Sequence, residues 1–563
     1  MAKKSKTVKT GIIILLVMFF SWRCANQLPP GGGPIDTIPP EIIEVFPNNG
    51  SIEYGDEYFE IKFSEYVDKR TVRDAIFISP PLKYGLDYNW SGKSLKVTFR
   101  DTLKENTTYT ITIGASVSDL NNSNKMIEPY TFAFSTGATI DEGEISGKIY
   151  DRDPGGVMVY AYKENEEEFN PTIQQPDYIS QVGKNGKYTL LGLSNGNYFI
   201  LAVKDRFMDL LYQSTDDYYG VQPFETKLTN ENKTIENVDF FLTVEDTITP
   251  QISFLFMKNA NHLVVEFSKP IDSSKTTIEN FYLYDSTANI KIIPVHFYKG
   301  DAKEKQYYLS FNDSLISENR IYLVSENIPD KLNNFSLKEE TQIDVKNNKD
   351  TSYVRILKIE TNYPDGKVDY DEPFLKINLD KGIDKSKAIS AVSIIDNKEN
   401  TIGYSVNFID DASFKIIVNE KLKQKSEYKL NIDLNLLEDV TGKSRDSIYV
   451  HKFNTASELD FSGVSGSVFN NENKIDSYVI LESTDKEKKK YKQKVKANNN
   501  FQIEKVMPGK YILWSFLDKN NDQIYTHGTI KPFIYSEKFK FYPDTLNLRA
   551  RWPVGDVNIE IQQ

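Results

Sequence analysis

The chain has 563 residues, too many for one hydrophobic core, and this length predicts roughly four to five domains of ordinary size. Hydrophobic residues make up 39% of the chain and aromatic residues 13%, which is enough to build packed cores, and the 34 Tyr favour β-structure. The formal net charge of −12 argues against nucleic acid as a partner, because an acidic chain repels phosphates.

The first residues have the form of an export signal. Four lysines lie among residues 3–9, and an apolar run follows at residues 11–22, which is short for a membrane-spanning helix. Cys24, the only cysteine in the chain, comes directly afterwards. The arrangement resembles a bacterial lipobox, which implies that residues 1–23 are a removable signal peptide and that Cys24 carries lipid. Arg23 departs from the small residue that a lipobox prefers, and an uncleaved signal anchor is the alternative.

The next segment, residues 24–36, is rich in Pro and Gly. Such a composition does not support a helix or a central strand. We expect it to be a spacer between the lipid and the first domain.

From residue 37 onward the pattern is that of an all-β protein. Apolar and polar residues alternate at period two in segments such as 58–63, 94–99 and 109–113, and Asn, Asp, Gly and Ser separate these segments. This pattern predicts tandem antiparallel β-sandwiches.

One repeated unit spans residues 37–137. It carries FEIKFSEYVD at 59–68, YTITI at 109–113 and FAFST at 132–136. These landmarks resemble the bacterial Ig-like domain. We identify a second copy at 249–347 and a degraded third copy at 351–456, in which Leu379 and Asp380 replace the Phe-Ser pair.

A different unit occupies residues 141–245 and recurs at 461–563. Six matched pairs of residues lie 313 positions apart: Tyr188/Phe501, Leu190/Ile503, Leu193/Val506, Gly196/Gly509, Tyr198/Tyr511 and Asp205/Asp518. A strand, a glycine turn and a second strand predict a hairpin with the tyrosine facing the core. The pattern resembles the transthyretin-like, carboxypeptidase-regulatory type of β-sandwich.

The whole arrangement resembles the Ig-like-domain lipoproteins of Bacteroidota, through the lipobox and the motif GGPIDTIPP at residues 32–40. The resemblance implies a protein anchored to the outer membrane by lipid on Cys24. It also implies a scaffold or accessory subunit of an integral outer-membrane protein complex for export, uptake or barrel assembly. Whether the domains face the periplasm or the cell surface stays open.

We find no catalytic motif in the sequence. The four histidines, His262, His296, His451 and His527, show no zinc-ligand spacing, and no nucleophile elbow, phosphate loop or dinucleotide fingerprint is present. We therefore expect a protein that is not an enzyme and has no cofactor. A carbohydrate-binding surface lipoprotein is the alternative function, because 34 Tyr and 33 Phe could supply exposed aromatic platforms.

One loop has the spacing of a calcium site. Asp518, Asn520 and Asp522 place three oxygen-bearing side chains at alternate positions, as calcium loops do. Gln523 stands where such a loop has glycine, and Thr529 where it has a bidentate glutamate. A β-turn favours the same Asp and Asn residues, so both interpretations stay open.

Asp-Ser or Asp-Thr followed by an apolar residue or Thr is the acceptor motif for O-glycosylation in Bacteroidota, and the resemblance extends it to this chain. The candidate acceptors are Thr37, Thr102, Thr247, Ser286, Ser314, Ser447 and Thr545. Asp-Thr is also common in turns.

Overall fold

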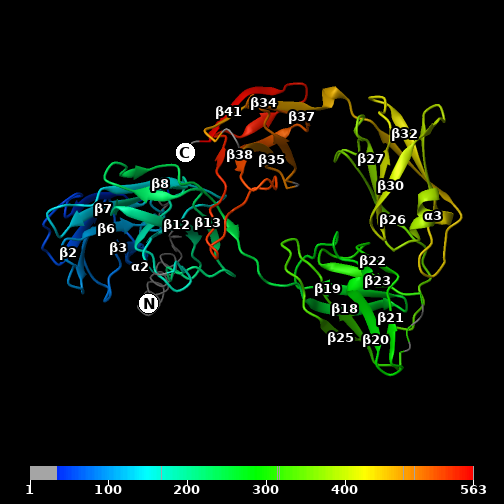
Figure 1. Cartoon of the computed structure of the whole chain (residues 1–563), viewed down its shortest axis with the longest axis horizontal. Helices are drawn as coiled ribbons and strands as arrows, with labels where there is room; N and C mark the ends of the chain where they lie inside the picture. The colour runs from blue at the N-terminus through cyan, green and yellow to red at the C-terminus, as the bar shows by residue number, and fades with distance from the viewer. Residues whose placement is uncertain are drawn as a thin grey trace, which may run out of the picture. The chain divides into compact units, whose positions relative to one another are not determined.

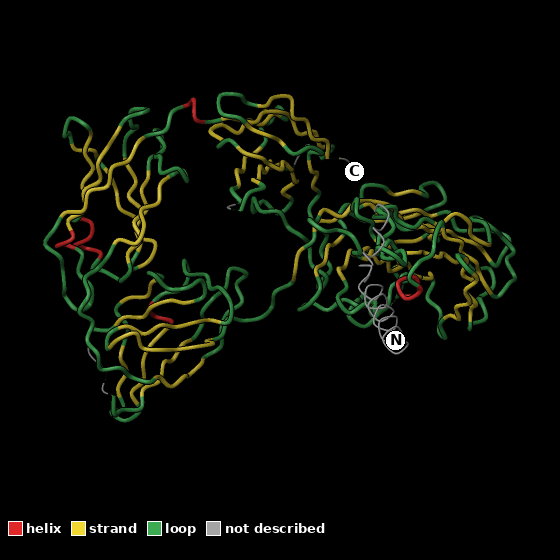
Figure 2. The backbone as a smooth tube through the Cα atoms, turned by 180° about the vertical axis from the view of Figure 1, so that it is seen from behind, coloured by secondary structure: helices red, strands yellow, loops and turns green. Residues whose placement is uncertain are grey.

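A computed structural model describes residues 35–166, 168–312, 315, 317–472, 475–486 and 488–561. Strands dominate these residues and the helices are short (Figure 2). The predicted all-β class of tandem β-sandwiches is confirmed. The predicted signal peptide and Cys24 lie outside the described residues. Within the described part of the chain, no helix has the length and apolar character to cross a membrane.

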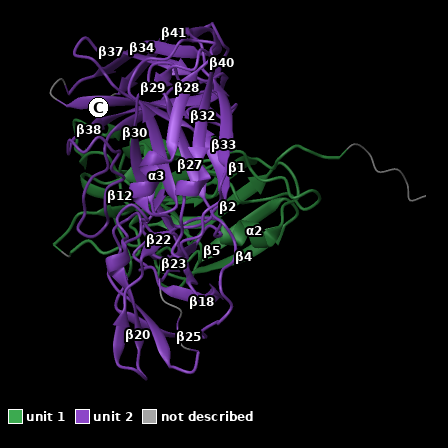
Figure 3. Ribbon diagram, turned by 90° about the vertical axis from the view of Figure 1, so that its right-hand side faces the viewer, with its two compact units in different colours: residues 1–212, 220–242 green, residues 213–219, 243–563 purple. Residues whose placement is uncertain are grey.

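The chain divides into two compact units, which Figure 3 colours separately. The first unit holds the described residues up to 212 together with 220–242, and the second holds 213–219 and the residues from 243 onward. We number the sandwiches 1 to 5 in chain order and describe each within its unit. The exact bounds predicted for the five domains stay predictions.

Sandwich 1 consists of two antiparallel sheets, ordered β1-β2-β5-β4 and β3-β6-β7. Figure 1 labels its β2, α2, β3, β6 and β7. Its elements are β1 (Ile42–Phe46), β2 (Tyr58–Phe63), α2 (Lys69–Asp74), β3 (Ile76–Ser79), β4 (Leu86–Ser91), β5 (Ser94–Phe99), β6 (Thr108–Ile113) and β7 (Tyr130–Ser135). β2 and β5 bury every second side chain, as the alternating sequence predicts. β6 buries all six residues, because it lies in the middle of its sheet and its outer threonines contact sandwich 2.

Sandwich 2 pairs β10-β9-β12, with β14 on β12, and places β11 and the short β15 and β16 on β8. β13 pairs with β17. The bounds are β8 (Gly143–Tyr150), β9 (Met158–Lys163), β10 (Tyr178–Gln181), β11 (Lys187–Leu193), β12 (Gly196–Lys204), β13 (Tyr218–Val221), β14 (Thr226–Leu228), β15 (Thr234–Ile235), β16 (Phe240–Phe241) and β17 (Thr243–Val244). β15 and β16 run parallel to β8.

Sandwich 3 has the sheets β18-β19-β23-β22 and β21-β20-β24-β25. Its elements are β18 (Ile252–Asn259), β19 (His262–Phe267), η1 (Ile278–Asn280), β20 (Phe281–Asp285), β21 (Ile290–Ile292), β22 (His296–Tyr298), β23 (Gln306–Ser310), β24 (Ile321–Ser325) and β25 (Glu339–Ile343).

Sandwich 4 repeats this order as β26-β27-β31-β30 and β29-β28-β32-β33. Its elements are β26 (Ile356–Thr361), β27 (Phe374–Leu379), α3 (Lys385–Ser390), β28 (Val392–Asp396), β29 (Thr401–Ile402), β30 (Tyr404–Asp410), β31 (Ser413–Val418), β32 (Glu427–Asp433), η2 (Leu434–Leu436) and β33 (Ile448–Asn454).

Sandwich 5 has the sheets β37-β34-β41 and β36-β35-β38-β39, with β40 on β38. Its elements are η3 (Glu458–Asp460), β34 (Ser462–Asn470), β35 (Asp476–Ser483), β36 (Lys490–Lys494), β37 (Asn500–Val506), β38 (Gly509–Asp518), β39 (Phe539–Phe541), β40 (Leu546–Leu548) and β41 (Val554–Ile561). β41 runs parallel to β34, as β15 and β16 run parallel to β8 in sandwich 2.

Sandwiches 2 and 5 also share their hairpin chemistry. The buried hydroxyl of Tyr198 donates to the carbonyl oxygen of Ser194 at 2.7 Å, and that of Tyr511 donates to the carbonyl oxygen of Met507 at 2.8 Å. Each tyrosine thus closes its own turn four residues back. The name transthyretin-like, however, stays a prediction.

Two glycines of the repeat are required by the close approach of a neighbouring strand. A Cβ atom at Gly147 would lie 2.1 Å from the carbonyl oxygen of Val238, and one at Gly466 would lie 1.8 Å from that of Val557. Both distances are far inside contact distance, so any side chain there forces the strands apart.

We predict that Gly466→Ala lowers the free energy of unfolding of sandwich 5 by roughly 1–3 kcal/mol, the usual cost of overpacking. Gly555→Ala is the matched control, because its Cβ meets its nearest neighbour, the Ser465 hydroxyl oxygen, at 3.8 Å. It should change stability by less than about 0.5 kcal/mol. Scanning calorimetry of the full chain measures both, and equal melting profiles for the two variants would contradict the prediction.

Candidate functional site at the junction of sandwiches 3 and 4

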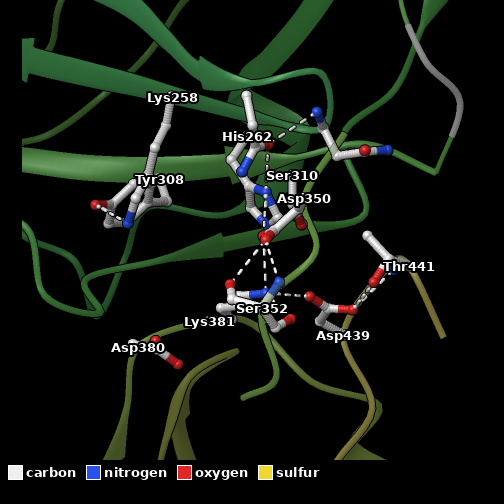
Figure 4. Close-up of polar contacts among 12 residues, drawn as sticks. Lys258, His262, Tyr308, Ser310, Asp350, Ser352, Asp380, Lys381, Asp439 and Thr441 are labelled. Carbon is white, nitrogen blue, oxygen red and sulfur yellow. Dashed lines mark hydrogen bonds and ion pairs between the residues drawn. The ribbon is translucent and has the colours of Figure 1, made fainter. Parts of the chain in front are cut away.

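A buried charge cluster joins sandwiches 3 and 4. Lys381, in the loop between β27 and α3, places its ammonium 2.7 Å from a carboxylate oxygen of Asp350 and 2.8 Å from one of Asp439. Asp350 lies in the segment that links the two sandwiches, and Asp439 lies between η2 and β33. Figure 4 shows the lysine between the two carboxylates. We call Asp350, Lys381 and Asp439 the charge cluster.

The cluster is nearly removed from water. The side chains of Asp350, Lys381 and Asp439 are 8%, 7% and 1% exposed. Lys381 also donates to the carbonyl oxygen of Ser352 at 2.7 Å. Burial by itself would raise the pKa of Asp350, but the hydrogen bonds from Lys381 and Ser352 outweigh it and hold this pKa well below its usual range.

His262, the first residue of β19, lies over the cluster from the side of sandwich 3. Its Nδ1 is 2.8 Å from the Asn259 side-chain oxygen and 3.6 Å from Asp350. Burial lowers the pKa of His262 to about 4, so the ring is neutral at physiological pH. Its Nε2 is buried and has no hydrogen-bond partner among the described residues.

His262, Asp350 and Asp439 lie close enough together to resemble the ligand set of a metal ion, since their ligand atoms are all within 4.8 Å of one another. The Lys381 ammonium already stands between the two carboxylates, and it supplies the positive charge that a metal would bring. The arrangement is therefore a structural ion cluster.

Further polar contacts tie the two sandwiches together beside the charge cluster. Asp411, in the turn after β30, accepts a hydrogen bond from the backbone N–H of Phe297 at 2.7 Å. Asp410 accepts one from the backbone N–H of Lys299 at 3.2 Å. Carboxylates of sandwich 4 thus satisfy backbone groups in and just after the edge strand β22 of sandwich 3.

The hydrophobic core also crosses the junction. Val264, Tyr298 and Tyr308 of sandwich 3 belong to the same buried cluster as the core residues of sandwich 4. Gly382 is required at this contact, because a Cβ atom there would lie 2.7 Å from the side chain of His296. Packing and charge pairing therefore act at one place.

A cleft of 770 Å³ opens between the two sandwiches next to the cluster. Its lining is largely polar and includes Ser273, His296, Asp384, Asp411 and Glu438. His296 contacts the hydroxyl of Ser310 at 3.1 Å, but Ser310 is fully buried, so this pair presents no accessible nucleophile. The lining Phe297 is also buried and offers no stacking platform, and carbohydrate binding stays a prediction.

The predicted calcium loop forms a turn. Asp518 accepts hydrogen bonds from the backbone N–H groups of Asp522 and Gln523 at 3.1 and 3.0 Å. Asn520 donates to the Asp522 carboxylate at 2.9 Å and accepts from the Asp522 backbone at 3.0 Å. These are turn contacts, and calcium at this loop stays a prediction.

Most of the predicted glycosylation acceptors lie at the surface. Ser447 is half-buried, and Ser314 lies outside the described residues. The exposed acceptors are Thr37, Thr102, Thr247, Ser286 and Thr545. Glycosylation itself stays a prediction.

Sequence reasoning missed the charge cluster, because Asp350, Lys381 and Asp439 come from three separated segments. One signal was present. Lys381 follows the second strand of its sandwich at the position that Lys269 takes in sandwich 3 and Glu65 takes in sandwich 1.

Comparison with known families places the first part of the chain. Residues 36–136 match the family model of the bacterial Ig-like domain. Sandwich 1 is therefore similar to the bacterial Ig-like domain. This confirms the resemblance for sandwich 1, whose predicted bounds were 37–137. No curated protein sequence matches the chain.

Solved structures of bacterial cell-surface proteins show weak likenesses. The N-terminal part of the bacterial S-layer protein SbsC is 14% identical with a TM-score of 0.17, and the match covers 37% of this chain and 45% of that one. SbsC domains 1–6 are 11% identical with a TM-score of 0.16, covering 91% and 67%. The major pilin subunit BcpA of Bacillus cereus is 10% identical with a TM-score of 0.13, covering 74% and 99%. Scores this low support no conclusion about function.

We predict that Lys381→Met destabilises the second unit by roughly 3–5 kcal/mol, because it leaves two buried carboxylates without a counter-charge. The matched control is Lys387→Met, since Lys387 pairs with Glu438 at 2.6 Å but its side chain is 44% exposed. The control should cost less than about 1 kcal/mol. Urea unfolding at neutral pH compares them, and a small effect of Lys381→Met would show that the cluster does not hold the junction.

We predict that stability falls as the pH drops from about 6.5 to about 4. Over this range the unfolded chain binds a proton at His262, whereas the folded chain does not, because burial lowers its pKa from 6.5 to about 4. The loss is on the order of 3 kcal/mol.

Unfolding measured at several pH values tests this. His262→Gln should reduce the slope most, and His451→Gln should reduce it less, because burial lowers the pKa of the half-buried His451 as well. A full slope in His262→Gln would assign the dependence to other groups.

Proposed function

We propose that the protein is a lipid-anchored, non-catalytic scaffold or accessory subunit of an outer-membrane protein complex, serving export, uptake or barrel assembly. The observation that carries the proposal is that consecutive sandwiches within each unit are held together by buried and half-buried polar contacts. An arm that holds its partners at a fixed place needs such junctions, whereas loosely linked domains move independently.

Within the first unit, sandwiches 1 and 2 share a hydrogen-bonded interface. Thr110 donates to the carbonyl oxygen of Leu191 at 2.9 Å. The backbone N–H of Ile179 donates to the hydroxyl of Ser79 at 3.1 Å. The outer face of β6 is thereby covered by the neighbouring sandwich.

Within the second unit, the charge cluster joins sandwiches 3 and 4, and a second ion cluster joins sandwiches 4 and 5. Lys505, near the end of β37, lies 3.1 Å from Asp369 and also pairs with Asp371. The rings of Tyr363 and Phe461 pack beside it with centroids 5.0 Å apart. Two consecutive junctions therefore combine charge pairing with packing.

Exposed apolar residues on edge strands supply a surface for the partner. β33 is an edge strand of sandwich 4 and exposes Ile448, Tyr449 and Val450 at 66%, 40% and 52%. An edge offers unpaired backbone groups, and a partner strand can add to it. Apolar side chains at that edge favour a protein partner over solvent.

We predict that Cys24→Ser abolishes labelling by a radioactive fatty acid and shifts the protein from the membrane to the soluble fraction. The thioether-linked lipid requires the thiol, and no second cysteine can replace it. The Ile448→Lys/Val450→Lys double variant should stay lipidated but lose its co-purifying outer-membrane proteins, identified by mass spectrometry after detergent extraction.

The matched control is Phe469→Lys, which charges a 50% exposed apolar residue on the central strand β34. It should keep the partners. A membrane extract in which the unaltered chain recovers no defined complex would contradict the proposal, and so would a Cys24→Ser protein that remains lipid-labelled.

A further inference from the structure

Sandwiches 3 and 4 hold an ammonium group in the same way at the base of their first strand. In sandwich 3, the Lys269 ammonium pairs with Asp246 and lies 2.6 Å from Asp330. It also donates to the carbonyl oxygen of Ile248 at 2.9 Å. Asp246 precedes the first strand, Lys269 follows the second, and Asp330 lies in the loop before the last strand.

In sandwich 4, Asp350, Lys381 and Asp439 take the corresponding places. The ammonium again contacts both carboxylates, and again donates to the carbonyl oxygen two residues beyond the first aspartate, that of Ser352. We call the place of the Lys269 and Lys381 ammonium groups the cation position.

Sandwich 1 has the same frame, by which we mean the aspartate before the first strand, the aspartate before the last strand and their hydrogen bonds. Asp36 precedes its first strand and accepts a hydrogen bond from the Ile38 backbone N–H at 2.9 Å, as Asp246 does from Ile248 at 3.2 Å. Asn124 donates to the carbonyl oxygen of Asp36 at 3.0 Å. Asn334 does the same to Asp246 in sandwich 3, at 2.6 Å.

The third carboxylate of sandwich 1 corresponds as well. Asp119 accepts from the side chain of Asn124 at 2.7 Å, as Asp330 accepts from that of Asn334 at 3.0 Å. Asp330 binds the lysine with the same oxygen that accepts from Asn334, so the loop hydrogen bonds leave room for a cation. Asp119 is 2% exposed.

The residue at the lysine position of sandwich 1 is Glu65. The ligand oxygens of Asp36, Glu65 and Asp119 lie within 4.8 Å of one another. Among the described residues, none of the three forms an ion pair with a lysine or arginine, and Lys93 nearby donates instead to the carbonyl oxygen of Ser64 at 2.7 Å. Three negative charges therefore meet where the two sister sandwiches hold a positive one.

We propose that sandwich 1 binds a divalent cation of the calcium class at the cation position, between Asp36, Glu65 and Asp119. The independent observation is the ammonium that the equivalent aspartates bind in sandwiches 3 and 4. Carboxylate oxygens are hard ligands, and calcium accepts six to eight oxygens at flexible geometry. The carbonyl oxygen of Ile38, equivalent to those that contact Lys269 and Lys381, adds a fourth ligand, and water completes the shell.

The site has a consequence for the start of the chain. Asp36 is the last residue of the predicted spacer, and the ion ties it to the loops that carry Glu65 and Asp119. Calcium thereby fixes the point at which sandwich 1 leaves its tether, and in sandwiches 3 and 4 a lysine fixes the entering segment without an ion.

Calorimetric titration of the full, EDTA-treated chain with calcium chloride tests the proposal. We expect one saturable site with a Kd of about 0.1–1 mM, the range of extracellular calcium modules. Saturating calcium should raise the melting temperature of one transition by about 4 °C.

Glu65→Lys supplies the ammonium of the sister sandwiches. It should abolish the calcium heat, and in EDTA it should melt about 4 °C above the unaltered chain. Glu65→Gln should also abolish the calcium heat. In calcium-free buffer, however, it should raise the melting temperature less than Glu65→Lys does. Glu105→Lys makes the same charge change at an exposed turn and should retain calcium binding.

Three outcomes would overturn the proposal. The first is no calcium heat in the unaltered chain. The second is a heat that survives Glu65→Lys but disappears in Asp522→Asn, which assigns the ion to the loop at Asp518. The third is a Glu65→Lys protein that is less stable in EDTA than the unaltered chain, because the three sandwiches would then not share one cation position.

Discussion

A cation held between two aspartates is the interaction on which both junctions of the second unit depend. Removing Lys381 from water costs several kcal/mol, and so does removing each of its carboxylates, so the cluster persists only when all three are present and aligned. Its three members come from the link, the loop after the second strand and the loop before the last strand. The cluster therefore forms only when the whole sandwich has folded, and it fixes where the incoming chain enters.

The same cluster serves a second purpose at the junction of sandwiches 3 and 4. His262 of sandwich 3 lies against Asp350, and the core of sandwich 4 continues into Tyr298 and Tyr308. The segment that links the two sandwiches also supplies Asp350 to the charge cluster. This segment is therefore held in place and cannot move freely. The junction of sandwiches 4 and 5 uses different residues, Lys505 with Asp369, but the same principle of a paired charge beside packed aromatic rings.

The three sandwiches with this frame differ at one decisive position. In sandwiches 3 and 4, Lys269 and Lys381 supply the positive charge that the aspartates need. In sandwich 1, Glu65 adds a negative charge, so the positive charge must come from a bound cation. A single exchange of sign thus converts a structural ion pair into a ligand site, since sandwiches 1 and 3 share the asparagine hydrogen bonds to both aspartates. The exchange lies in sandwich 1, the domain nearest the predicted lipid anchor.

The all-β class could be predicted from the sequence, because alternation at period two is a local property of each strand, as in residues 94–99. The repeats could also be predicted, because the equal spacing and the glycine turn before Tyr198 and Tyr511 are features of short stretches of sequence. The charge cluster could not be predicted from the sequence. Asp350, Lys381 and Asp439 are ordinary surface-type residues in sequence, and only the pairing of distant strands brings them together and buries them. Only the tertiary structure shows that Glu65 faces two aspartates, because the charge of a residue does not determine which distant residues lie beside it.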